Sequence, residues 1–247
     1  MKKYDSNVIL FILLIVMSLL LYLIQILFFR NPRDTIFYFL QDVAFLPLQV
    51  AIVTIILGKI LTIREKREKI KRINMIISPF FNEIGIDLLY FLLRFYCMPE
   101  DLKSSMKITS TWTKSDFQRV IKLIHHYHFQ ISCKEIDLQV LKRILSDKRD
   151  FLLKILENPN LLEHETFTDM LWSIFHLADE LQARESIINL PDSDLNHLTV
   201  DLKRVFKTLL MQWIYHLLHL KQEYPYLYSL EIRRNPFEED RSVIVRE

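Results

Sequence analysis

The first quarter of the chain is almost continuously apolar, whereas apolar and charged positions are interleaved in the rest. Between Val8 and Phe29, large apolar side chains are interrupted only at Ser18, Tyr22 and Gln25. A helix of this length, at about 1.5 Å per residue, crosses a hydrocarbon core of about 30 Å. We therefore predict a transmembrane helix over residues 8–29. The stretch is too long for a signal peptide and lacks a small-residue cleavage site.

A second apolar stretch extends from Ile36 to Ile63 and is too long for one simple crossing. Its first part contains Asp42 and ends at Pro47. We interpret residues 36–46 as an interfacial stretch and residues 43–63 as the second crossing. Basic residues follow this crossing directly, which places both termini in the cytoplasm of an inner-membrane protein. The basic residues expected at the membrane surface are Arg64, Lys66, Arg67, Lys69, Lys71 and Arg72.

Small residues recur at steps of three or four along the second crossing and therefore share one helical face. Because close backbone approach packs membrane helices, this face predicts a partner helix, either in another copy of the chain or in the first crossing of the same chain. A hydrogen bond between Gln25 and Gln49, which lie at similar depth, would join the two helices as a hairpin. The predicted helix-packing residues are Ala44, Pro47, Ala51, Thr54 and Gly58.

Asp42 is the single acidic residue of the second apolar stretch. An ionisable group at membrane depth is costly unless it meets water or a partner. We expect interfacial hydration, or pairing with Arg30 or Arg33. The alternative is a place in an ion path, in which a ring of Asp42 side chains would favour cations.

The residues after Ile63 are sufficient for one compact domain. Each segment between its prolines shows helical periodicity, and no comparable stretch alternates with period two. The predicted fold is all-α: a two-helix transmembrane hairpin followed by an all-helical cytoplasmic domain. The predicted boundaries are 1–63 for the hairpin, 64–98 for a basic stalk and an apolar helix, 99–235 for the helical bundle and 236–247 for a C-terminal tail. We expect the last helix to end at Pro225 and to lead into an aromatic, then charged, irregular segment.

The segment from Ile84 to Tyr96 is apolar on nearly every side but contains Asp87 and Arg94. It is too short to span a bilayer, so we interpret it as a central core helix. A helix lying on the inner membrane surface is the alternative. The spacing of apolar residues before it predicts that the second crossing continues as a helical stalk with a kink near Pro79.

Composition excludes several classes of site. Gly58 and Gly85 are the only glycines, so neither a P-loop nor a dinucleotide-binding loop is possible. Cys97 and Cys133 match no metal or disulfide spacing. A net charge of +2 does not indicate a nucleic-acid partner.

Histidines are the best candidates for chemistry, and two predicted helices carry them beside carboxylates. His176 and Glu180 share one face, and His197 and Asp201 lie on the next helix together with His216. Spacings of three or four allow two side chains to reach one metal ion. Each face lies opposite a leucine stripe, so we interpret both as solvated polar faces. Without a nucleophile elbow or a metalloprotease motif, we expect no catalytic residue, cofactor or metal.

The apolar hairpin, the segment Ile73–Gly85 after the basic residues and the segment Glu223–Phe237 together resemble an uncharacterised group of bacterial membrane proteins. The resemblance covers most of the chain. It implies a bacterial inner-membrane location and supplies no activity and no functional residues.

The expected function is that of a non-enzymatic, membrane-anchored interaction or signalling module that acts through its helical domain. Its expected partners are the lipid bilayer, further copies of the chain and a cytoplasmic protein. An oligomeric two-helix ion channel or pore-forming effector is the first alternative. A metal-binding helical enzyme is the second, because the histidine faces would supply its ligands.

Overall fold

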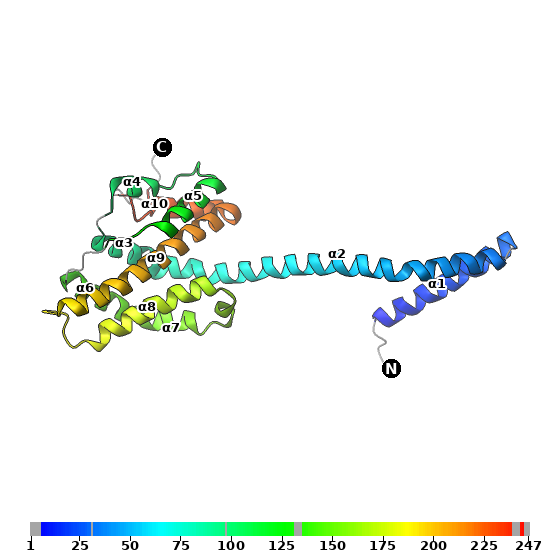
Figure 1. The fold of residues 1–247 in the computed structure, drawn as a ribbon, viewed down its shortest axis with the longest axis horizontal. Helices are drawn as coiled ribbons and strands as arrows, with labels where there is room; N and C mark the ends of the chain where they lie inside the picture. The colour runs from blue at the N-terminus through cyan, green and yellow to red at the C-terminus, as the bar shows by residue number, and fades with distance from the viewer. Residues whose placement is uncertain (1–5, 31, 97, 131–134, 239–242, 245–247) are drawn as a thin grey trace. The chain divides into compact units, whose positions relative to one another are not determined.

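A computed structural model describes residues 6–30, 32–96, 98–130, 135–238 and 243–244 (Figure 1). The regular secondary structure of these residues is helical throughout, which confirms the all-α prediction. The chain divides into two compact units, Met1–Lys66 and Arg67–Glu247. The first contains helix α1 (Ser6–Phe29) and most of the apolar part of helix α2 (Pro32–Phe80).

The end of α1 is formed by a residue in the left-handed backbone conformation. Arg30 has a φ of 52° and donates its backbone N–H to the Ile26 carbonyl at 3.0 Å. A left-handed residue in this position ends a helix by satisfying one of its last carbonyls. Pro32 then begins α2, where its fixed φ suits the first helical position and its missing N–H is not needed.

Helix α2 continues without a break through Pro47, so the predicted interfacial stretch over 36–46 and the predicted crossing over 43–63 belong to one helix. Their placement relative to a membrane stays a prediction. A proline inside a helix removes one backbone hydrogen bond and strains its neighbours, but it does not have to end the helix. The helix also runs on through the basic segment to Phe80. A turn of π-helix, η1 (Phe81–Gly85), follows where the sequence predicts a kink.

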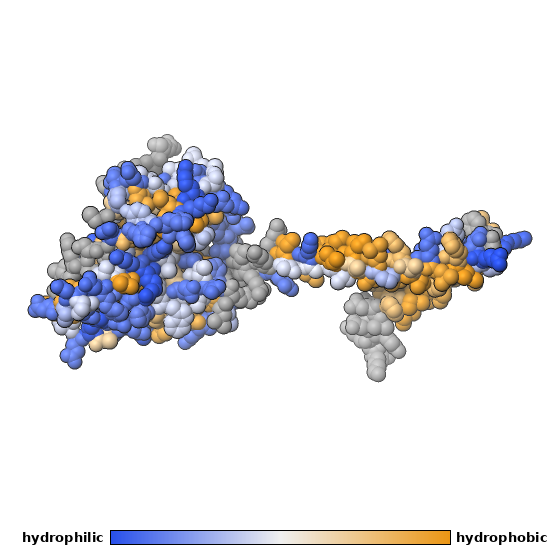
Figure 2. Space-filling view, in the orientation of Figure 1, coloured by the Kyte–Doolittle hydropathy of each residue, from blue (hydrophilic) through white to orange (hydrophobic). Residues whose placement is uncertain are grey.

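Most of the described side chains of α1 and of the first part of α2 are apolar and exposed. Figure 2 shows hydrophobic residues gathered along these two helices, while the visible face of the helical domain is mostly hydrophilic. Ile9–Phe28 and Pro32–Glu65 are long and apolar enough to cross a bilayer by length and composition. Asn74–Phe95 also meets these criteria, but more than half of it is buried inside the protein.

The second unit is built around one long helix. Helix α9 packs against α8, α10, α5 and α3 (Figure 1). The largest fully buried side chains include Trp213 and Phe206 of α9. The elements after η1 are α3 (Ile86–Leu92), η2 (Leu93–Phe95), α4 (Glu100–Ser105), α5 (Lys114–His126), α6 (Glu135–Asp147), α7 (Arg149–Leu156), η3 (Pro159–Glu163), α8 (Glu165–Ala183), α9 (Asp192–Glu223) and α10 (Pro225–Arg233).

The apolar segment Ile84–Tyr96 lies in the core of this unit. Ile86, Leu89 and Leu92 are fully buried, in agreement with the first of the two interpretations from the sequence. Its packing depends on Gly85, where a Cβ atom would lie 2.6 Å from Cδ1 of Phe81. Because that ring is itself buried, a larger residue at this position would have to displace it.

The region after Pro225 is more ordered than the sequence predicts. Pro225 starts helix α10 instead of an irregular tail, because proline is well suited to the first position of a helix. The Tyr228 hydroxyl donates to the Thr109 carbonyl at 2.8 Å. The Asn235 side chain donates to the Met106 carbonyl at 2.9 Å and accepts from the Phe237 backbone at 3.0 Å. The bundle therefore includes residues up to Phe237, which is buried.

Candidate functional site

Helices α8 and α9 form an antiparallel pair connected by a short loop. Ser173 on α8 contacts Thr208 on α9 with their hydroxyls 3.2 Å apart, and Glu180 contacts His197 further along the pair. The loop contains Asn189, which has a φ of 61°. Asparagine adopts this left-handed conformation more readily than most residues, so it allows the chain to reverse.

Two pairs of side chains spaced four residues apart face each other across these helices. They are His176 and Glu180 on α8, and His197 and Asp201 on α9; we call the four residues the α8–α9 cluster. His176 Nε2 lies 3.3 Å from Asp201 Oδ2 and 3.9 Å from Glu180 Oε1. His197 Nε2 lies 3.6 Å from Asp201 Oδ2 and 3.6 Å from Glu180 Oε2. Each imidazole therefore contacts both carboxylates.

The Asp201 side of the cluster is buried, whereas its histidine side is exposed to solvent. The Asp201 side chain is only 3% exposed, whereas the side chains of His176 and His197 are 48% and 50% exposed. Oδ1 of Asp201 accepts a hydrogen bond from Arg204 at 2.7 Å. Oδ2 is buried and has no hydrogen-bond donor in the described part of the chain, although it lies beside both histidines.

Arg184 fixes the positions of two carboxylates, that of Glu180 in the cluster and that of Asp194 at the start of α9. Its guanidinium binds Asp194 through two hydrogen bonds of 2.8 and 2.6 Å and donates to Glu180 Oε2 at 2.8 Å. These hydrogen bonds lower the pKa of Glu180 and the pKa of Asp194 from their usual values. Both groups are therefore held as carboxylates, the form that can bind a cation.

The arrangement offers imidazole nitrogens and carboxylate oxygens to a common point. One candidate ligand atom from each of His176, Glu180 and His197 lies within 4.8 Å of the others. Two kinds of chemistry are compatible with this set. The histidines can be protonated and form ion pairs with the carboxylates, or they can be neutral and share a metal ion with them.

The sequence shows both pairs of histidine and carboxylate, but we interpreted the helix faces that carry them as solvated. The structure corrects this interpretation for α9. Asp201, Gln212 and His216 of α9 are buried because α9 is enclosed on several sides. The useful signal was the repetition of a histidine followed four residues later by a carboxylate on two consecutive helices. A short loop between such helices brings the two pairs together.

A polar contact joins α1 to α2, but it is made by other residues than the predicted Gln25 and Gln49. The Tyr22 hydroxyl donates to Asp42 Oδ2 at 3.4 Å, and the Tyr22 ring lies edge-on to Phe39 at 6.0 Å. Gln25 is half-buried and Gln49 is exposed, and they do not form the predicted hydrogen bond. Tyr22 and Asp42 lie at comparable distances from the turn, eight residues before Arg30 and ten after Pro32, whereas Gln49 lies much farther from the turn than Gln25. Asp42 therefore contacts Tyr22, and Arg30 and Arg33 do not make the pairing that was expected.

The other predicted site residues lie on α2. The small-residue face is exposed, and the space around Gly58 contains no atom within 4 Å of an added Cβ. This face consists of Ala44, Pro47, Ala51, Thr54 and Gly58. Arg64 lies on the same helix and is exposed. The side chains of Lys66, Arg67, Lys69, Lys71 and Arg72 lie outside the described residues.

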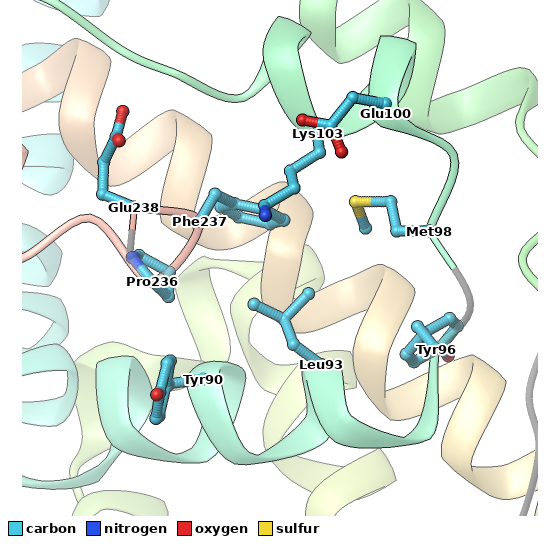
Figure 3. A pocket seen from close by; sticks show the side chains of 9 residues that line it. All are labelled: Tyr90, Leu93, Tyr96, Met98, Glu100, Lys103, Pro236, Phe237 and Glu238. Atoms are coloured by element: carbon cyan, nitrogen blue, oxygen red, sulfur yellow. The ribbon is translucent and has the colours of Figure 1, made fainter. Parts of the chain in front are cut away.

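A cavity of about 340 Å³ lies beside η2 and the residues after α10 (Figure 3). Leu93, Met98 and Phe237 give it an apolar lining, while its charged residues, Lys103, Glu100 and Glu238, are of both signs. Such a lining does not favour a ligand of one charge. The α8–α9 cluster is therefore the more specific arrangement of functional groups.

Two family models match the chain. One is described as "MJ1433, N-terminal helical domain" and matches residues 2–61; the other is described as "Uncharacterized protein MJ1433, C-terminal helical domain" and matches residues 69–233. The uncharacterised protein MJ1433 of Methanocaldococcus jannaschii is 43% identical over 246 residues, which cover 100% of this chain and 98% of that protein. No solved structure matches. This relative is archaeal, so the bacterial origin implied by the resemblance is not supported.

Proposed function

This chain belongs to the family of the uncharacterised protein MJ1433, and we propose that it is a membrane-anchored interaction or signalling module. The observation that carries this proposal is the contrast between the two units. Residues 9–28 and 32–65 expose apolar side chains throughout, whereas the unit from Arg67 onwards has its own buried core. An exposed apolar surface of this extent requires lipid or protein to cover it.

The proposed topology is a two-helix transmembrane hairpin with both termini in the cytoplasm. It is supported by the turn at Arg30, by the contact between Tyr22 and Asp42, and by the basic residues that follow the second apolar stretch. The small-residue face of α2, on which Gly58 has open space, is proposed to contact further copies of the chain.

The topology predicts which positions react with a membrane-impermeant maleimide in intact cells. In a chain carrying Cys97→Ser and Cys133→Ser, an Arg33→Cys variant is expected to react because the α1–α2 turn is outside. A Glu185→Cys variant is expected to react only after permeabilisation, because its exposed position belongs to the cytoplasmic domain. Reaction of Glu185→Cys in intact cells would refute the topology.

The proposed action is to bind a cytoplasmic protein, and Trp172 is a suitable contact for it. This side chain is 60% exposed on α8, and large aromatic residues often contribute strongly to protein interfaces. Full-length chain extracted from its own membranes in mild detergent is expected to retain a stoichiometric protein partner. Trp172→Ala is expected to release this partner, whereas Gln182→Ala, at an exposed polar position of the same helix, is expected to retain it.

A purified chain that turns over a substrate without a protein partner would contradict the interaction proposal.

The ion-channel alternative is less favoured, because Asp42 already accepts a hydrogen bond from Tyr22 of its own chain. Asp42 and Gln49 also lie on the side of α2 opposite to Ala51 and Gly58. An oligomer packed through its small residues would therefore direct Asp42 away from its axis.

A further inference from the structure

We infer that the α8–α9 cluster is a binding site for one divalent transition-metal ion, with Zn²⁺ as the ion that its donor atoms suit best. Two imidazole nitrogens and two carboxylate oxygens form a donor set that zinc commonly accepts. Calcium and magnesium prefer sites made entirely of oxygen atoms, so the histidines select against them. This inference does not depend on the proposed interaction function.

The contacts of Asp201 Oδ2 with the two histidines are close to those of a four-coordinate site. Zinc bonds to nitrogen and oxygen of about 2.0–2.1 Å in a tetrahedron place neighbouring donor atoms about 3.3–3.4 Å apart. The shortest contact in the cluster, from His176 Nε2 to Asp201 Oδ2, is 3.3 Å. Asp201 Oδ2 also lies 3.6 Å from His197 Nε2. Glu180 contacts His176 through Oε1 at 3.9 Å and His197 through Oε2 at 3.6 Å. Glu180 has a candidate ligand atom within 4.8 Å of those of both histidines, so a rotation of its carboxylate would bring it to an ion held by the other three residues.

The buried oxygen of Asp201 is independent evidence for a ligand. Among the described residues, Oδ2 has no hydrogen-bond donor, although its side chain is only 3% exposed. A buried carboxylate oxygen without a hydrogen bond is unfavourable, because it has lost its hydrogen bonds to water. It lies within 3.6 Å of both histidine Nε2 atoms, at the place that an ion bound to the imidazoles would occupy. A metal ion would supply the missing partner.

The surrounding arginines orient the carboxylates without occupying that place. Arg204 binds Oδ1 of Asp201, which leaves Oδ2 directed toward the histidines. Arg184 holds Glu180 through Oε2, while Oε1 lies beside His176. Contacts of this kind fix the ligands of metal sites and strengthen binding. With neutral imidazoles, the two carboxylates carry the negative charge that a divalent ion neutralises.

The exposed side of the α8–α9 cluster would let solvent reach a bound ion. His176 and His197 are about half exposed, so water or a small ligand can reach a metal ion from the histidine side. Ions in closed structural sites lack such access, whereas exchangeable sites have it. An ion held here would also link α8 to α9, and it would reduce their freedom to separate.

The test uses the full-length chain in detergent, purified through a tag without histidine, stripped with a chelator and titrated with ZnCl₂. Wild type is expected to bind one Zn²⁺ per chain in competition with a chromophoric chelator. His176→Ala/His197→Ala is expected to lose this binding. His125→Ala/His126→Ala removes two adjacent exposed imidazoles elsewhere and is expected to retain it. Arg204→Gln is expected to weaken binding by about 10–100-fold, because it removes only an orienting contact.

Folding and coordination are measured separately. Circular dichroism checks that each stripped variant is helical, and Zn²⁺ is expected to raise the melting temperature of wild type but not of the double variant at 176 and 197. Co²⁺ in place of Zn²⁺ is expected to give the intense visible bands of a four-coordinate ion. Equal Zn²⁺ binding by wild type and the folded double variant would overturn the inference, and so would an absence of stoichiometric binding by wild type.

Discussion

Trp213→Ala is expected to reduce the free energy of unfolding of the helical domain by about 3–5 kcal/mol. The Trp213 side chain is fully buried on α9, and its ring centroid lies 5.6 Å from that of Phe237. Because α9 packs against most of the domain, the surrounding side chains cannot close the resulting cavity without moving several helices. The effect is measured by urea unfolding of the full-length chain in detergent, followed by circular dichroism.

Trp172→Ala provides the matched control. It removes the same side chain from α8, where that side chain is 60% exposed, and should change the free energy of unfolding by less than about 0.5 kcal/mol. Similar losses for the two variants would show that α9 is not enclosed as the structure describes it. An unchanged stability would also confirm that the loss of a partner by Trp172→Ala does not come from unfolding.

Acidification below pH 6.5 is expected to destabilise the domain strongly through His216. This side chain is buried, and its ring is stacked on Phe81 with a centroid separation of 5.0 Å. Burial, with a smaller contribution from His219, lowers its pKa from the usual 6.5 to about 3. Between these values the unfolded chain binds a proton that the folded chain does not, so stability falls as the pH falls. The loss is about 1.4 kcal/mol per pH unit at most from this group.

His216→Gln removes the titrating group, and the slope of stability against pH is the quantity to measure. The variant is expected to show a shallower slope than wild type between pH 6 and pH 4.5, whatever its absolute stability. Burial also lowers the pKa of His219 and raises the pKa of Glu231, so the difference between the two slopes is what isolates His216. A chelator is present in all samples, so that metal binding does not contribute to either slope. An unchanged slope in His216→Gln would contradict the assignment.

Local properties of the sequence were sufficient to predict the helices. The nearly continuous apolar side chains over residues 8–29 and 36–63 and the three-to-four spacing of leucines later in the chain depend only on near neighbours. Helix boundaries were less predictable at prolines. Pro47 lies inside α2 and Pro225 starts α10, because the same ring can be accommodated within a helix or begin one.

The contacts of polar groups were harder to predict because they depend on packing between distant segments. The sequence placed Gln25 and Gln49 at similar depth, but in the continuous helix α2 Gln49 lies 17 residues beyond Pro32, and Tyr22 contacts Asp42 instead. The register and the exact approach of α1 to α2 decide such a pairing. Neither is contained in the periodicity of one helix.

The sequence by itself determined that this protein is helical, that its apolar residues are concentrated at one end, and that His176 and Glu180, like His197 and Asp201, lie one helical turn apart. Only the tertiary structure decided that the two pairs face each other. The antiparallel packing of α8 and α9 brings them together, and the enclosure of α9 excludes water from Asp201. Burial changes a solvated carboxylate into a group that requires a partner, and burial is a property of the assembled helices.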